Sequence, residues 1–192
     1  MKKRLIFILT LWSLLVVFKT AAAAPAVAGL FLEANDLVYT NRYVNQAVHD
    51  AFNRTGNWSE FDWLDDETCR KEAKLWMLNQ ASRRYRYIEE LPNSEMQKLC
   101  QELGLDYAVI VFIDNGEGDM RAGFYTDTFT VVVETTLKVF DVKKGKYIFV
   151  ESGIAEGSSR SSYINLPSAS KAYVDGVIKS MSRIRVDTYS LP

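Results

Sequence analysis

The stretch from Asp106 to Gly157 constrains the fold most, because three strand patterns follow one another within it. Residues 106–114 form an unbroken apolar run, which is typical of a strand buried on both faces. The next run alternates with period two, as a half-buried strand does. Its apolar face carries Phe129, Val131, Val133, Leu137 and Val139.

A turn at Asp141–Lys146 brings the chain back, and Gly145 can adopt the positive φ that a short hairpin loop requires. Residues 147–155 then form the third strand. Its apolar residues are expected to share one face: Ile148, Val150 and Ile154. The sequence therefore predicts an antiparallel meander, with a polar turn at Asp114–Asp119 and a serine-rich loop at Gly157–Ser162.

The first 26 residues have the layout of a secretory signal peptide. Met1–Arg4 is positively charged, Leu5–Phe18 is apolar, and Ala21–Ala26 offers small residues for cleavage. The apolar run is too short for a comfortable membrane anchor. We therefore expect an exported protein, periplasmic or extracellular, that is soluble and makes no stable insertion into a membrane after cleavage.

The length and composition favour one globular domain over residues 27–184, followed by a C-terminal tail at 185–192. The chain has 192 residues, of which 48% are hydrophobic, enough to bury a core. The predicted signal peptide contains four of the 23 basic residues and none of the 24 acidic ones, which leaves 19 basic against 24 acidic residues and a net charge of −5. This acidic balance argues against nucleic acid as a partner.

Two cysteines, Cys69 and Cys100, remain in a chain expected to be exported. A disulfide between them would close a 31-residue span and stabilise the fold by roughly 3–4 kcal/mol. Their spacing matches neither a redox motif nor a zinc motif. The sequence leaves open whether they form a disulfide or remain buried thiols.

The remaining elements complete an α/β (α+β) pattern. A capping-box pattern, Ser94 with Gln97, marks one helix start, and Pro167 marks another. The predicted order is β-α-β-α-α-β-β-β-α, with a mixed sheet of about five strands and helices packed on it. The first and third strands are expected to be parallel neighbours. The earlier predicted elements are a strand at 28–34, a helix at 42–55, an edge strand at 58–64 and a helix at 65–84.

The chain resembles a group of bacterial envelope proteins that contains the N-terminal domain of TolB, the curli-secretion subunit CsgG and LpoB. The resemblance rests on Leu91-Pro92 before a helix that ends at Glu102–Tyr107, and on a strand at Val133–Asp141 that leads into Val142–Lys146. It covers residues 28–184 in the order of elements. It implies binding and assembly work at the envelope, with no catalytic residues and no cofactor to transfer.

Few residues of the sequence are candidates for catalysis or metal binding. The only histidine, His49, lies on the polar side of its predicted helix, and we expect it to be exposed without an oriented partner. Asp114, Glu117 and Asp119 are the candidates for a metal site, but a solvated turn explains them better because their spacing fits no EF-hand.

Aromatic and cationic residues supply the candidate interaction surface. Two groups are involved, a short aromatic segment and the end of a helix, although burial of the rings in the core is an equally ordinary outcome. The candidates are Trp58, Phe61, Trp63, Arg83, Arg84 and Arg86.

The sequence therefore favours an exported, non-enzymatic binding or assembly domain, whose partner is an envelope protein or a second copy of itself. Binding through a sheet edge is one mode that such a domain could use. Two alternatives stay open. One is a carboxylate-dependent hydrolase of an envelope polymer that uses Glu117 and Asp119, and the other is a module that binds a small ligand or a metal.

Overall fold

The computed structural model describes residues 25–35, 42–79, 85–123, 126–162 and 168–191. The signal peptide predicted at residues 1–26 lies outside this part of the chain except for its last two residues, and so do Arg83, Arg84 and Pro167. In the described ranges, no helix is both long and apolar enough to cross a membrane.

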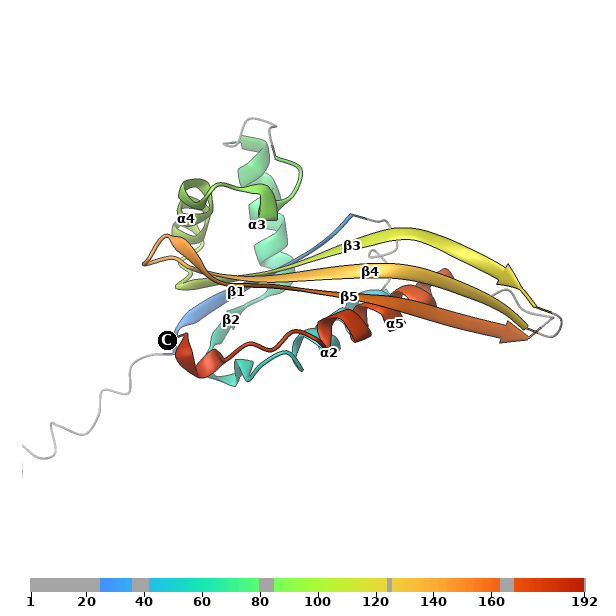
Figure 1. Cartoon of the computed structure of the whole chain (residues 1–192). Helices are drawn as coiled ribbons and strands as arrows, with labels where there is room; N and C mark the ends of the chain where they lie inside the picture. The colour runs from blue at the N-terminus through green and yellow to red at the C-terminus, as the bar shows by residue number, and fades with distance from the viewer. Residues whose placement is uncertain (1–24, 36–41, 80–84, 124–125, 163–167, 192) are drawn as a thin grey trace, which may run out of the picture.

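The described elements follow one another in the predicted order (Figure 1). The strands are β1 (Val27–Ala34), β2 (Asp62–Leu64), β3 (Tyr107–Ala122), β4 (Thr126–Asp141) and β5 (Lys146–Ser162). The helices are α2 (Arg42–Phe52), α3 (Asp66–Asn79), α4 (Asn93–Glu102) and α5 (Ala169–Met181). Short 3-10 turns occur at Trp58–Glu60, Ile88–Glu90 and Thr188–Ser190.

The five strands form one mixed sheet in the order β2-β1-β3-β4-β5. β1 is parallel to both β2 and β3, whereas β3, β4 and β5 are antiparallel. The predicted α+β class, the parallel pairing of the first and third strands, and the C-terminal meander are thus confirmed. The hairpin between β4 and β5 also forms as expected, with Gly145 at a φ of +63°.

Two predicted loops are strands in the structure. Residues 114–119 continue β3, with a register shift between Asn115 and Gly118, and residues 157–162 continue β5. Both polar segments pair with residues 126–134 of β4, which satisfies the backbone hydrogen bonds on that side of each segment. Their composition resembles that of a loop because much of this end of the sheet is exposed, and no apolar alternation is needed there. The predicted strand at 58–64 is likewise shorter, because Trp58–Glu60 forms a 3-10 turn, although β2 lies at the sheet edge as expected.

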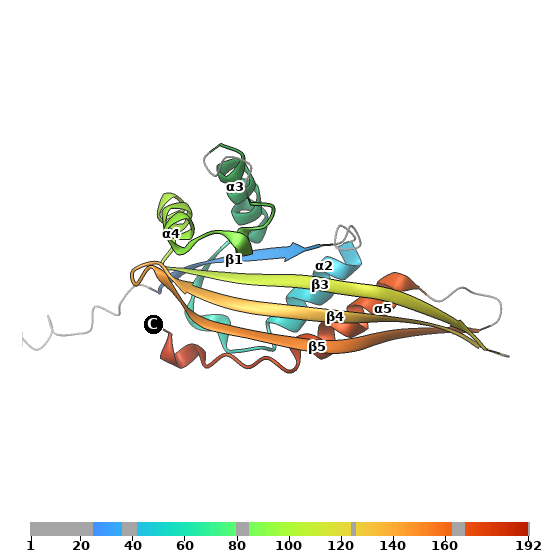
Figure 2. The same ribbon diagram turned by 45° about the horizontal axis from the view of Figure 1, so that its top comes forward.

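The helices cover the two faces of the sheet unequally (Figures 1 and 2). α2 and α5 lie along one face, whereas α3 and α4 cover only one end of the other. The core on the α2/α5 side includes Leu32, Val48, Phe52, Val133, Leu137 and Val177. The core on the α3/α4 side includes Phe31, Trp76, Leu99, Ile110 and Phe140. Beyond α3 and α4, no described helix covers this face of the long β3–β5 meander (Figures 1 and 2).

Of the three apolar residues predicted on one face of β5, Ile148 packs against the core on the α2/α5 side, but the other two do not. Val150 and Ile154 are 59% and 50% exposed, while Gly153, Ala155 and Gly157 are buried. The reason is the closeness of α5, because a Cβ on Gly153 or Gly157 would lie less than 3.0 Å from the backbone of α5. The buried side of α5, together with Ile184 just after the helix, includes Ala172, Tyr173, Gly176, Val177, Ser180, Met181 and Ile184.

Two side chains of α5, together with Arg183 just after the helix, also cap the free edge of β5. Arg183 donates to the carbonyl oxygen of Ile154, and the Lys179 ammonium donates to that of Glu156 at 3.2 Å. The Ser158 amide donates to the Asp175 carboxylate at 2.9 Å, and Lys179 pairs with this carboxylate at 2.6 Å. An unpaired edge of this length is a template for strand addition. Here one backbone group of each of Ile154, Glu156 and Ser158 already has a side-chain partner.

Removing these capping side chains should allow the free edge of β5 to pair with a second copy of the protein. We expect the D175A/K179A/R183A variant to form dimers or larger species at concentrations where the wild type does not, because the outward groups of β5 lose their partners. Size-exclusion chromatography with light scattering measures this. K171A, which removes an exposed lysine from the same helix, is the control. An unchanged mass for the triple variant would contradict the capping role.

The residues after α5 pack back onto the domain. The Val186 amide donates to the Thr55 carbonyl at 2.8 Å, and the Tyr107 hydroxyl donates to the Leu191 carbonyl at 2.6 Å. Val186 and Leu191 are both 7% exposed. The end of the described chain therefore contributes to the core on the α2/α5 side.

Candidate binding groove

One apolar stripe of α3 packs against the sheet and α4 and so positions the helix. Cys69, Ala73 and Trp76 recur at helical spacing and are buried against the sheet and α4. Asp66 and Glu67 occupy the first turn, where the positive end of the helix dipole favours carboxylates.

α4 starts directly after Pro92, which is its N-cap residue. The predicted capping box of Ser94 and Gln97 is wrong, because Gln97 instead donates its amide to the Val142 carbonyl at 2.7 Å. This bond ties α4 to the hairpin between β4 and β5. Met96, Leu99 and Cys100 form the buried side of α4, so that Leu99 meets Trp76 of α3 in one core cluster.

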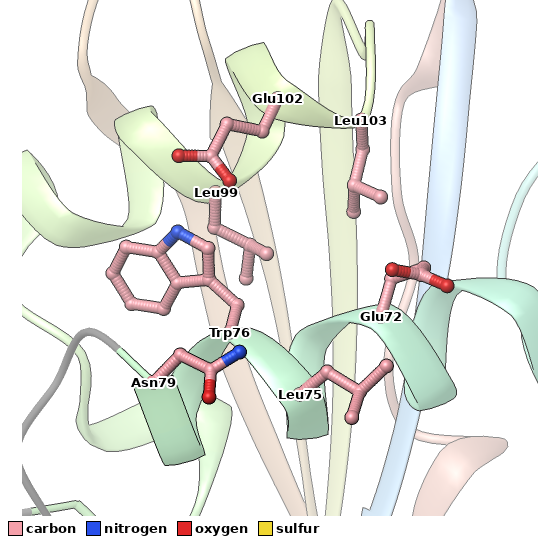
Figure 3. Close-up of a pocket in the computed structure, with 7 residues that line it drawn as sticks. All are labelled: Glu72, Leu75, Trp76, Asn79, Leu99, Glu102 and Leu103. Carbon is pink, nitrogen blue, oxygen red and sulfur yellow. The ribbon is translucent and has the colours of Figure 1, made fainter.

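A cavity of about 290 Å³ lies between the two helices, and we call it the α3–α4 groove. Its floor is apolar, and polar groups flank it (Figure 3). The lining residues are Glu72, Leu75, Trp76, Asn79, Leu99, Glu102 and Leu103. Leu75 is 44% exposed at this site.

The polar groups of the groove lack partners in the described part of the chain. Glu72 and Glu102 are exposed, and no ion pair joins either of them to another described residue. Trp76 is only 6% exposed, yet its indole Nε1 has no acceptor among the described residues. In Figure 3 this nitrogen points toward α4. A buried donor without an acceptor is costly, and a bound molecule could satisfy it.

The two cysteines lie beneath the groove as buried free thiols. Burial raises the pKa of Cys69 to about 11 and that of Cys100 to about 12. Such thiols stay protonated near neutral pH and are poor nucleophiles. They belong to the core on the α3/α4 side.

The aromatic residues of the candidate interaction surface lie mostly inside the molecule. Trp58 and Phe61 are 5% and 7% exposed. Trp58 stacks on Phe52 with ring centroids 4.8 Å apart, and Trp63 is half-buried in the same cluster. These rings therefore form core rather than a free surface.

Within the described residues, the cationic candidates are not part of this aromatic cluster. Arg86 is exposed, and its guanidinium lies 5.3 Å from the centroid of the Tyr87 ring. Arg83 and Arg84 lie outside the described residues. The described structure thus does not bring the six predicted residues together into one patch.

The three carboxylates proposed for a metal site all lie exposed on β3. Asp114 accepts a hydrogen bond from the Asn35 amide, and Asp119 pairs with Arg121 at 3.1 Å. The solvated turn expected at these residues is wrong, because they form part of a strand. Within the described ranges, no group of three His, Cys, Asp or Glu residues could hold a metal ion.

His49 has a carboxylate partner, Asp66, which its position in the sequence did not predict. Its Nε2 lies 3.0 Å from Asp66 Oδ2, and the His49 side chain is 31% exposed. The prediction of an exposed, unpartnered ring is therefore wrong. The two residues are 17 positions apart, and only the packing of α2 beside the start of α3 brings them together. The pair borders a cavity of about 190 Å³ that Trp63 also lines.

The α3–α4 groove itself was not predicted as a site. The sequence identifies Leu75, Trp76 and Leu78 as apolar surface of one helix, but it does not distinguish their roles. In the structure Trp76 is buried, Leu75 lines the groove, and Leu78 is 63% exposed outside it. The sequence signal that could have revealed the groove is the width of the apolar stripe on α3. This stripe contains more apolar residues than packing against the sheet alone requires.

Comparison with known proteins identifies similar solved structures only. No family model matches the chain, and no curated protein matches it. Lipoprotein GNA1162 from Neisseria meningitidis is 19% identical over 75% of this chain and 88% of that chain, with a TM-score of 0.39. The LpoB C-terminal domain from Escherichia coli is 12% identical over 71% and 86%, with a TM-score of 0.32.

TolB from Acinetobacter baumannii is 16% identical over 77% of this chain and 25% of that chain, with a TM-score of 0.29. LpoB and TolB are both members of the group that the sequence resembles.

Proposed function

We propose that this domain is a non-enzymatic binding module of the cell envelope, and that it holds a segment of a partner molecule in the α3–α4 groove. One observation carries the proposal. The groove combines an apolar floor with the buried indole nitrogen of Trp76, which has no hydrogen-bond acceptor among the described residues. Exposed apolar surface that also offers unsatisfied polar groups is typical of an interface.

Binding in this groove is favoured over strand addition along the middle of β5. There the backbone groups of Ile154, Glu156 and Ser158 already bond to Arg183, Lys179 and Asp175. Binding is also favoured over hydrolysis by Glu117 and Asp119. Both lie exposed on β3 and line neither the α3–α4 groove nor the cavity beside His49, whereas a hydrolase needs its carboxylates to flank a bound substrate.

The test compares two substitutions on α3. The tagged mature protein is cross-linked in its own cell envelope, and the captured proteins are identified by mass spectrometry. L75R replaces part of the groove floor with a charged side chain, so we expect it to reduce capture of the partner at least about tenfold, as loss of a central contact can. L78R makes the same change at an exposed position outside the groove and should capture the partner as the wild type does.

An equal loss with both variants, or with neither, would refute the groove as the binding site. Circular dichroism spectra of the two variants should match that of the wild type, because both leucines are exposed.

A further inference from the structure

We propose that the segment held in the α3–α4 groove is a polypeptide that inserts a lysine or arginine side chain between Glu72 and Glu102. The inference rests on the proposed function and names the chemistry of the partner. It follows from the size of the groove, from its charges and from the indole nitrogen of Trp76.

The size of the groove suits one side chain. Its volume is about 290 Å³, at the lower limit of the roughly 300–1,000 Å³ typical of sites that enclose a drug-sized ligand. A whole cofactor would not be enclosed here. One long side chain, with the backbone of its own segment lying across the opening, is a better match.

The charges of the groove select a cation. Glu72 comes from α3 and Glu102 from α4, and neither has an ion-pair partner among the described residues. Among the described residues, no lysine or arginine lines the groove. Lysine and arginine combine a cationic head with an apolar stem, and the stem can lie along apolar surface while the head stays near water. Leu75, Leu99 and Leu103 provide such a surface.

Trp76 distinguishes a polypeptide from a simple cation. Its Nε1–H needs an acceptor, and a peptide carbonyl next to the inserted side chain supplies one, whereas a polyamine does not. The indole ring also offers a cation–π contact to the inserted side chain. A peptide with a basic residue therefore satisfies the carboxylates, the apolar floor and the indole donor together.

The experiment titrates the mature protein with the capped tripeptide Leu-Arg-Leu and follows the indole N–H signals by NMR. W76F assigns the signal of Trp76. We expect this signal to move to a saturating value with Leu-Arg-Leu and to move much less with Leu-Gln-Leu. The E72Q/E102Q variant should bind Leu-Arg-Leu about tenfold more weakly, since it loses two charge pairs. Raising the salt concentration should weaken binding to the wild type.

The control is E117Q/E151Q, which removes two exposed carboxylates outside the groove and should bind as the wild type does. The proposal is overturned if Leu-Gln-Leu binds as tightly as Leu-Arg-Leu, if spermidine moves the Trp76 signal as far as the peptide, or if neither peptide moves it.

The same variant separates this inference from the proposed function. If E72Q/E102Q captures the envelope partner at the wild-type yield while L75R does not, the groove binds a partner but not through a cation. In that case the binding function stands and the inference fails. If L75R also captures the partner normally, the groove is not the binding site and both fail.

Discussion

The G157A variant is expected to be about 3 kcal/mol less stable toward unfolding than the wild type. The strand β5 and the helix α5 touch at Gly157, where a Cβ would lie less than 3.0 Å from the Ala172 carbonyl oxygen and from the Gly176 amide nitrogen. These are backbone atoms, so no side-chain rotation can relieve the overlap. Overpacking usually costs 1–3 kcal/mol, and a rigid site should give the upper end of that range.

G116A provides the matched control, because Gly116 is also a strand glycine. A Cβ there would lie 3.7 Å from the nearest atom, the Val132 carbonyl oxygen, which is an ordinary contact. We expect its stability to stay within about 1 kcal/mol of the wild type. Urea denaturation followed by circular dichroism measures both variants. Equal stabilities for G157A and G116A would contradict the backbone contact between β5 and α5.

The E33Q substitution is expected to change how stability depends on pH. Burial raises the pKa of Glu33 from 4.5 to about 7, despite a hydrogen bond that its carboxylate accepts from the Ile88 amide, at 2.8 Å. Between these two pH values the folded state holds a proton that the unfolded chain has released. The contribution of Glu33 to stability is therefore full below pH 4.5 and declines as the pH rises to 7. The total loss is about 3 kcal/mol.

Glutamine cannot ionise, but it still offers an oxygen to the Ile88 amide. The stability of E33Q relative to the wild type should thus increase by about 3 kcal/mol between pH 4.5 and pH 7. Urea denaturation at both pH values gives this difference, in which the other titrating groups largely cancel. E117Q removes an exposed carboxylate from β3 and should show no such change. A constant difference between E33Q and the wild type would mean that Glu33 ionises at the same pH in the folded state as in the unfolded chain.

The sequence predicted those features of the fold that depend on local patterns. The hairpin at residues 141–146 needed only a glycine at the position of positive φ, and the inward face of β4 needed only alternation of apolar residues. The lengths of β3 and β5 did not follow, because exposed polar segments pair with β4 without any apolar pattern of their own. The buried face of β5 was missed because it is lined by small residues rather than apolar ones.

The groove and the pair of His49 with Asp66 depend on contacts between elements that are distant in the sequence. Glu72 and Glu102 are 30 positions apart, and no spacing rule places α3 beside α4. Likewise, no spacing rule places the ring of His49 beside the start of α3. Sequence alone could identify apolar helix surface, but only the tertiary packing decides which part of it stays open and which polar groups face it.

The contact between β5 and α5 also defines a way to search for distant relatives. Strand positions 153, 155 and 157 are Gly, Ala and Gly, and helix positions 172, 176 and 180 are Ala, Gly and Ser. Because backbone meets backbone between them, a larger residue at Gly153 or Gly157 would force the helix off the strand. Two spaced triplets of small residues, one with period two and one with period four, should therefore persist in chains whose overall identity has fallen too low to reveal a common origin.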